Sequence, residues 1–217
     1  MKIVGVVGGG PAQDLPDLKE YDSDSVFWIG ADRGNLTLLE HNIIPQIGVG
    51  DFDSINADEM LTIDQCSIKI ETYSTQKDET DLELAIQKAI EINPDIIYLF
   101  GVTGGRLDHE LINIHMLYRI EKAGIKGVLI NKSNWIELKL PGMHKIEYEP
   151  KFKYISFIPQ SLSVLDLTLE GFIYPLKDKE VQFGSTLCIS NQLNGKIGTF
   201  SFTSGILIVV KSRDVLD

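Results

Sequence analysis

The first 130 residues alternate short apolar runs of β type with segments of helical periodicity, and this alternation restricts the fold more than any other feature of the chain. The clearest helical segment is ETDLELAIQKAIEIN at residues 79–93, with Thr80 or Asp78 as its candidate N-cap. A second segment, residues 107–124, ends at Gly124. The β-type runs are IVGVVG (3–8), VFWIG (26–30), IGVG (47–50), SIKIETY (67–73), DIIYLFG (95–101) and GVLINK (127–132). Strands separated by helices predict βαβ units and a mostly parallel sheet.

The pattern changes near residues 131–134. Beyond them, turn residues such as Pro141-Gly142 and Asn194-Gly195 separate short β-type runs, and no helical periodicity follows. The runs are WIELKL (135–140), HKIEY (144–148), YISFIP (154–159), VLDLTL (164–169), TLCIS (186–190), GTFSF (198–202) and GILIVV (205–210). We therefore predict a Rossmann-like, mostly parallel α/β domain over residues 1–132 and an antiparallel β-sandwich or barrel over residues 133–217.

The charge balance narrows the class of protein. With 20 basic against 31 acidic residues, the chain carries a formal charge of −11, whereas a nucleic-acid-binding protein would present a basic face. Cys66 and Cys188 lie far apart without metal or redox spacing, and we expect reduced thiols. The apolar run at the N-terminus ends after about five residues, which is too short for a signal peptide or a membrane span. These features predict a cytoplasmic protein without membrane or nucleic-acid partners.

Four of the predicted parallel strands run into polar loops. The loops are ADRG (31–34), DFDS (51–54), STQKDETD (74–81) and TGGRLDH (103–109). In an open parallel sheet, ligands bind outside the carboxyl ends of the strands. We therefore expect these four loops to meet at one edge of the sheet.

Each loop by itself also has a purely structural explanation. Asp51 can cap a helix or form an Asx turn. Asp53 and Ser54 precede a helical stretch and can serve as its N-cap. Acidic residues at the start of the predicted helix 79–93 interact favourably with the positive end of its dipole. Gly104-Gly105 can form a simple turn. The four histidines show no zinc-ligand spacing such as HExxH.

Taken together, the loops favour a site for a metal ion and a polyphosphate. Four carboxylates at close range repel one another unless a cation lies among them, and oxygen donors of this kind suit Mg²⁺. The carboxylates are Asp51, Asp53, Asp78 and Asp81. The glycine-rich loop with Arg106 opens a helix and offers N–H groups and a guanidinium to phosphate, and Lys77 adds a further positive charge.

These motifs resemble those of the bacterial thiamine pyrophosphokinase (thiamine diphosphokinase) family over nearly the whole chain. The matching segments are GADRG (30–34), IIPQIGVGDFDSI (43–55), KDETDLELAI (77–86), GVTGGRLDHELINI (101–114), LEGFIYPL (169–176) and ISN (189–191). The resemblance implies transfer of pyrophosphate from ATP to the hydroxyl of thiamine, which gives thiamine diphosphate and AMP. It also implies a homodimer with thiamine bound where two subunits meet. In ADRGNL (31–36), Arg33 and Leu36 stand where the ADGGAN of many members has a glycine and an asparagine.

The resemblance also implies roles for the loop residues. The four carboxylates would hold one or two Mg²⁺ ions, and one of them or Asp108 would accept the hydroxyl proton. Lys77 and Arg106 would offset phosphate charge. The nucleotide would be bordered by Asp32, Gly34 and Ser54, with Thr103, Gly104 and Gly105 along phosphate or sugar. Thr80 would cap its helix or touch phosphate, and His109 would act as a structural hydrogen-bonding group or as an acid. In the β domain, the candidates for thiamine are Ser190, Asn191 and Ser204.

Two other functions are compatible with parts of the pattern. A Mg²⁺-dependent phosphohydrolase acting on a nucleotide or phosphate ester also carries Asp-x-Asp after a strand, but it expects Gly-Thr where this chain has Ser54-Ile55. A nucleotide sensor with the same fold would bind ATP and give no product. Formation of AMP that requires thiamine separates the transferase from both.

Overall fold

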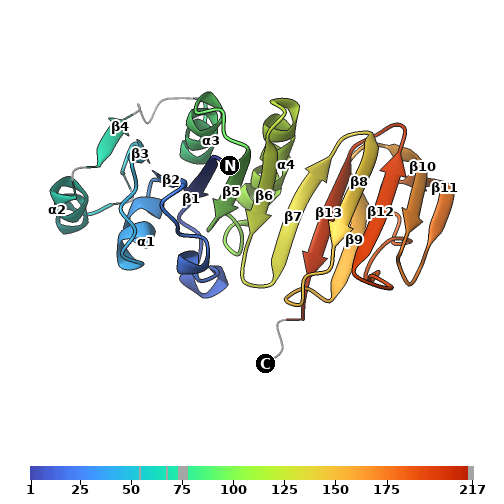
Figure 1. Ribbon diagram of the computed structural model, residues 1–217. Helices are drawn as coiled ribbons and strands as arrows, with labels where there is room; N and C mark the ends of the chain where they lie inside the picture. The colour runs from blue at the N-terminus through green and yellow to red at the C-terminus, as the bar shows by residue number, and fades with distance from the viewer. Residues whose placement is uncertain (54, 67, 73–77, 215–217) are drawn as a thin grey trace. The chain divides into compact units, whose positions relative to one another are not determined.

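The computed structural model describes residues 1–53, 55–66, 68–72 and 78–214. The chain divides into two compact units, residues 1–132 and residues 133–217, which differ in architecture (Figure 1). Ser54 and Lys77, which the sequence places in the site, lie outside the described residues.

In the described part of the first unit, six parallel strands pair in the order β4-β3-β2-β1-β5-β6. The strands are β1 (Ile3–Val7), β2 (Val26–Ala31), β3 (Ile47–Gly50), β4 (Lys69–Thr72), β5 (Ile96–Phe100) and β6 (Lys126–Ile130). The chain moves outward from β1 to β4 and then crosses to β5 on the other side of β1. Connections therefore reverse direction between β1 and β5, the point at which open α/β sheets bind ligands.

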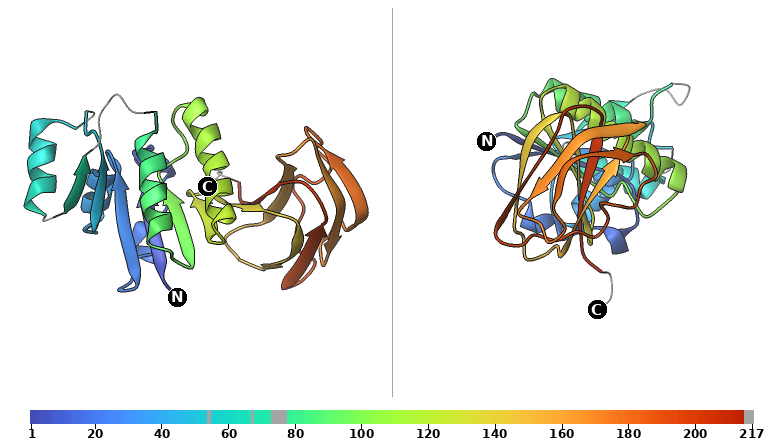
Figure 2. Two further views of the ribbon diagram at one scale, coloured as in Figure 1. Left: turned by 90° about the horizontal axis from the view of Figure 1, so that it is seen from above. Right: turned by 90° about the vertical axis from the view of Figure 1, so that its right-hand side faces the viewer.

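Helices cover both faces of this sheet (Figure 2). The α-helices are α1 (Gly34–Glu40), α2 (Ala57–Gln65), α3 (Asp81–Glu91) and α4 (Leu107–Lys122), and two short 3₁₀ turns, Ala12–Asp14 and Leu18–Glu20, follow β1. Helix α1 packs on α2, and α3 packs on α4. The central strands are buried on both faces, as the uninterrupted apolar runs of the sequence predict.

The described residues of the second unit, 133–214, form seven antiparallel strands. They are β7 (Asn134–Lys139), β8 (Gly142–Glu147), β9 (Tyr154–Pro159), β10 (Ser163–Glu170), β11 (Leu176–Gln182), β12 (Ile197–Phe202) and β13 (Leu207–Ser212). β13 pairs with β7 and β9, and a second sheet has the order β11-β10-β12-β8. Both sheets contribute to one apolar core, where the Phe157 ring from β9 meets the Phe200 ring from β12 edge to face at 5.1 Å. The unit is therefore a sandwich.

The predicted fold class is confirmed, and one strand assignment in the second unit is wrong. Residues 186–190 (TLCIS) form turns instead of a strand, and Ser190 has a φ of 59°. Cys188 is buried there, and its carbonyl accepts a hydrogen bond from Phe157 N at 3.0 Å. The sequence pattern missed β11, because its central residues, Lys177 to Glu180, are charged and exposed. Among the described residues, no helix is both long and apolar enough to cross a bilayer.

The helix starts show which local signals act as caps. Thr80, one of the two predicted candidates, caps α3, and its hydroxyl accepts a hydrogen bond from Glu83 N at 3.2 Å. Helix α2 begins at a capping box in which the Asn56 side chain accepts from Asp58 N and Glu59 N, both at 3.0 Å. Asn56 therefore holds the cap position that the sequence suggested for Asp53 and Ser54.

We expect Asn56→Ala to lower the free energy of unfolding by about 1 kcal/mol, because two backbone N–H groups of α2 lose their acceptor. Urea unfolding measures the change. Asn56→Asp keeps an acceptor at the same place and serves as the control. An unfolding midpoint of the Ala variant equal to that of the unaltered protein would contradict this role of Asn56.

Candidate active site

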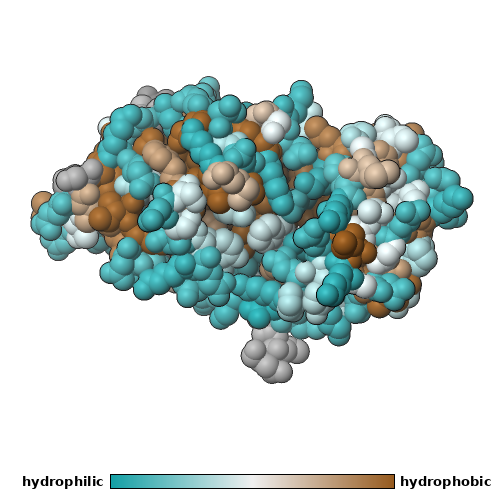
Figure 3. Space-filling view, in the orientation of Figure 1, coloured by the Kyte–Doolittle hydropathy of each residue, from teal (hydrophilic) through white to brown (hydrophobic). Residues whose placement is uncertain are grey.

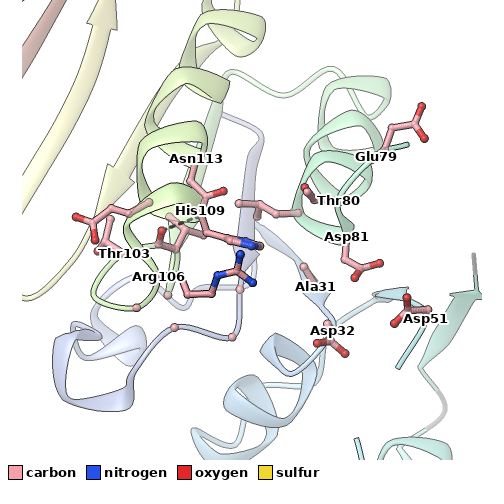
Figure 4. Close-up of a pocket in the computed structure, with 18 residues that line it drawn as sticks. Ala31, Asp32, Asp51, Glu79, Thr80, Asp81, Thr103, Arg106, His109 and Asn113 are labelled. Carbon is pink, nitrogen blue, oxygen red and sulfur yellow. Dashed lines mark hydrogen bonds between the residues drawn. The ribbon is translucent and has the colours of Figure 1, made fainter. Parts of the chain in front are cut away.

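A pocket of about 460 Å³ lies at the carboxyl end of the parallel sheet (Figure 4). Its lining comes from segments far apart in the chain. These are Gly8–Gly10 after β1, Ala31 and Asp32 at the end of β2, Asp51 after β3, residues 79–82 at the start of α3, residues 101–103 with 105 and 106 after β5, and His109, Glu110 and Asn113 of α4. The predicted meeting of the four polar loops is therefore observed within the described residues.

The glycine turn after β1 forms part of the pocket wall. Gly8 N donates to Phe100 O at 2.8 Å and Gly10 N donates to Gly101 O at 2.7 Å, so this turn is fastened to the end of β5. Gly8–Gly10 are absent from the predicted site, although three consecutive glycines after an apolar run are a visible signal of a turn. Gly34, which was predicted to border the nucleotide, does not line the pocket. A Cβ on Gly34 would come within 1.8 Å of Val7 O, so glycine lets α1 start directly against β1.

Carboxylates gather on one side of the pocket. Asp32, Asp51 and Asp81 come from three different loops, and Figure 4 shows their side chains near one another, across the pocket from the α4 side chains. Asp32 has a φ of 48°, and its N–H donates to Val49 O at 2.8 Å, which joins the end of β2 to β3.

Asp51 and Asp53, on either side of Phe52, differ in their surroundings. Phe52, with a φ of 57°, is buried against Leu36 and Ile63 between α1 and α2. Asp51 lines the pocket and accepts a hydrogen bond from Asp53 N at 3.2 Å, whereas Asp53 is exposed and outside the lining. Asp78 is likewise exposed and outside the lining. The metal-binding roles of Asp53 and Asp78 stay predictions.

The donor chemistry of the pocket fits Mg²⁺ bound together with a phosphate. Within the described ranges, no three His, Cys, Asp or Glu side chains are arranged to hold a metal ion by themselves. Mg²⁺ does not require such a set, because it commonly takes one or two carboxylates and completes its shell with water and substrate phosphates. Asp51 and Asp81 would supply such carboxylates.

Arg106 supplies positive charge to the pocket, and it is paired with an acid from its own helix turn. Its Nη2 lies 2.6 Å from Asp108 Oδ2 and its Nε lies 3.2 Å from Asp108 Oδ1. The hydrogen bond from Arg106, with a smaller contribution from His109 N–H, lowers the pKa of the Asp108 carboxyl.

The loop between β5 and α4 is held by polar side chains that are not among the predicted site residues. Asn113 Nδ2 donates to Val102 O at 2.8 Å, Asn131 Nδ2 donates to Thr103 Oγ1 at 3.0 Å, and Gly104 N donates to Glu110 Oε2 at 3.1 Å. Thr103 and Gly105 line the pocket, whereas Gly104 does not. These contacts depend on how α4 and the end of β6 pack beside the loop, which the sequence pattern does not show.

The three thiamine candidates lie in the second unit and differ in environment. Asn191 is 2% exposed, its side-chain oxygen accepts from Tyr174 N and Gln192 N, and its Nδ2 donates to Tyr174 O at 2.8 Å. Ser190 and Ser204 are exposed. Asn191 thus fixes a turn of the sandwich, and the binding roles of all three residues stay predictions.

The fold and the pocket define an α/β protein with a pocket lined by glycines, carboxylates and Arg106 at the switch point of its sheet, followed by a β-sandwich. Two family models match the chain: "Thiamin pyrophosphokinase, catalytic domain" over residues 18–129 and "Thiamin pyrophosphokinase, vitamin B1 binding domain" over residues 143–207. A thiamine pyrophosphokinase of Bacillus subtilis (strain 168) is 48% identical over 214 residues, covering 99% of this chain and 100% of the relative.

Solved structures agree with these matches. The crystal structure of thiamine pyrophosphokinase from Bacillus subtilis gives a TM-score of 0.95 at 47% identity, covering 99% of this chain and 100% of the other. The structure from Geobacillus thermodenitrificans gives 0.91 at 41% identity, covering 98% of both chains. The thiamin pyrophosphokinase from Candida albicans, at 19% identity and a TM-score of 0.84 over 98% of this chain and 89% of the other, shares the fold. This chain belongs to the thiamine pyrophosphokinase family of enzymes.

Proposed function

We propose that this protein transfers the β,γ-pyrophosphoryl group of ATP to the hydroxyl of thiamine, giving thiamine diphosphate and AMP. The observation that carries the proposal is the pocket itself, in which Asp32, Asp51 and Asp81 lie across from Arg106 in a chain that matches the family along its length. The thiamine hydroxyl oxygen forms a bond to the β-phosphorus, the bond from that phosphorus to the α–β bridging oxygen breaks, and AMP leaves with that oxygen. The hydroxyl proton passes to a base.

The residues of the pocket would act mainly by position and charge, as in phosphoryl transfer generally. Arg106 would exchange Asp108 for phosphate oxygens, with Thr103 and Gly105 beside the triphosphate. Asp32 and Thr80 would border the nucleotide. Mg²⁺, held by Asp51 and Asp81, would neutralise phosphate charge when bound. In this proposal Gly34 and Gly104 shape the backbone. Residues next to them make the contacts to ATP that the sequence predicted for these two glycines.

The experiment that tests the proposal is incubation with ATP, Mg²⁺ and thiamine, followed by chromatographic separation of the products. We expect AMP and thiamine diphosphate in equal amounts, and no AMP when thiamine is omitted. Release of phosphate without thiamine would favour the phosphohydrolase. Binding of ATP without any product would favour the sensor.

We further propose that the protein is a homodimer that binds thiamine through its second unit. Support comes from large apolar side chains left exposed there: Leu162 is 90% exposed and Phe183 is 65% exposed, and Phe183 N donates to Leu162 O at 3.0 Å, so the two are neighbours. Figure 3 shows hydrophobic residues among the hydrophilic ones over both units, on the face that it draws. Adjacent apolar residues of this kind mark contact surfaces.

Sedimentation equilibrium tests the assembly. We expect twice the chain mass of 24.2 kDa, and we expect Leu162→Asp with Phe183→Asp to shift the protein toward the monomer, because a charge at a packed apolar contact is costly. Leu61→Asp, which changes an exposed apolar residue of the first unit, is the matched control. A fully active monomer would contradict the proposed assembly.

A further inference from the structure

The loop that carries Arg106 is fastened at three successive residues by side chains from elsewhere in the first unit. Asn113 binds Val102 O, Asn131 binds the Thr103 hydroxyl, and Glu110 binds Gly104 N–H, with distances of 2.8, 3.0 and 3.1 Å. Asn113 and Thr103 are buried, at 8% and 6% exposure. Such contacts fix a loop before its ligand arrives, which is the condition for preorganised charge at a reaction site.

Glu110 holds the residue at which the loop changes direction. Gly104 has a φ of 88°, a value that favours glycine, and a Cβ there would come within 2.1 Å of Asp14 Oδ2. Gly104 is outside the pocket lining, whereas Gly105 and Arg106, the next two residues, belong to it. The hydrogen bond from Gly104 N–H to Glu110 therefore sets the path by which the chain brings Arg106 to the pocket.

We propose that Glu110 is a positioning residue for the transfer reaction: by accepting the Gly104 N–H, its side chain places Gly105 and Arg106 for the triphosphate. This inference rests on the proposed function. Glu110 also lines the pocket, so a direct role as metal ligand or as base is the competing explanation. The two explanations differ in what they require. Positioning needs a hydrogen-bond acceptor, whereas acceptance of a proton needs the carboxylate, and ligation of Mg²⁺ is much weaker without its negative charge.

Two substitutions at this position separate the explanations. Glu110→Gln keeps a carbonyl oxygen that accepts the Gly104 N–H, and Glu110→Ala removes it. Glu121→Ala removes the same side chain about three turns further along α4, away from the pocket, and serves as the control. The measurements are kcat and KM for ATP, together with equilibrium binding of α,β-methylene ATP, whose α–β bridge resists cleavage, by calorimetry.

We expect Glu110→Ala to weaken binding of the analogue and to lower kcat/KM for ATP by about tenfold or more, and Glu110→Gln to restore both to within about threefold of the unaltered protein. Glu121→Ala should match the unaltered protein. A Gln variant as impaired as the Ala variant, or an unimpaired Ala variant, would overturn the positioning role. If Glu110→Ala does not fold, a loss of more than about tenfold in Glu110→Gln still overturns it.

Failure of the underlying function gives a different result. If the unaltered protein forms no AMP in the presence of thiamine, the proposed reaction is wrong. The binding series with the ATP analogue then still decides whether Glu110 positions the loop for a nucleotide.

Discussion

Replacing Asp51 or Asp81 by Asn will reduce thiamine-dependent formation of AMP by at least about a thousandfold, because each change removes a charge that would hold Mg²⁺ against the triphosphate. Asparagine has nearly the same volume, and at position 51 its side-chain oxygen can still accept the hydrogen bond from Asp53 N. At position 81 the loss of a favourable charge at the start of α3 costs at most about 1 kcal/mol of stability. The fold should therefore survive both changes.

The measurement is the rate of AMP formation at saturating ATP and thiamine, with thermal unfolding of each variant recorded in parallel. Asp24→Asn, at an exposed turn before β2 and outside the pocket, is the matched control. Activity of either pocket variant within about tenfold of the unaltered protein would refute the metal-binding role. Asp53→Asn and Asp78→Asn then decide whether two carboxylates or the predicted four serve the metal ion.

Arg106→Ala should lower kcat/KM for ATP by about thirtyfold, which corresponds to about 2 kcal/mol of lost transition-state stabilisation. Arg106→Lys should recover part of this loss, since it restores the charge without the two-pronged geometry of the guanidinium. Arg119→Ala, in the helix that follows Arg106, is the control, because Arg119 pairs with Glu83 at the surface, away from the pocket. Kinetic constants for ATP that barely change in Arg106→Ala would show that Arg106 does not contact the phosphates.

The architecture could be predicted from the sequence because each unit has its own periodicity. Buried parallel strands need apolar residues on both faces, and the runs 3–8 and 95–101 have them, so β1 and β5 were found. The antiparallel unit was recognised by its short runs and turns, but one strand was missed and one was predicted where the chain forms turns. An exposed edge strand such as β11 has no apolar signature, and an apolar stretch such as residues 186–190 can bury Cys188 from a turn.

The acidic half of the pocket followed from the sequence, since loops after parallel strands meet at one edge. What the sequence did not specify is which residue of each loop faces inward. In DFDS, burial of Phe52 leaves Asp51 in the pocket and Asp53 outside it. Gly8–Gly10 could not be assigned from the sequence because their partners, Phe100 and Gly101, lie far along the chain. Glu110 lies only six residues from Gly104, and its role depends on how the loop turns back toward the start of α4, which the residue pattern does not specify.

Strand β11 forms an outer edge of the four-stranded sheet, and four consecutive charges of alternating sign, Lys177 to Glu180, occupy its middle. An unpaired strand edge invites a neighbouring chain to add itself by backbone hydrogen bonding, and lysines and acids at such an edge discourage that addition. The sandwich is thereby guarded against open-ended, fibre-like growth along this side.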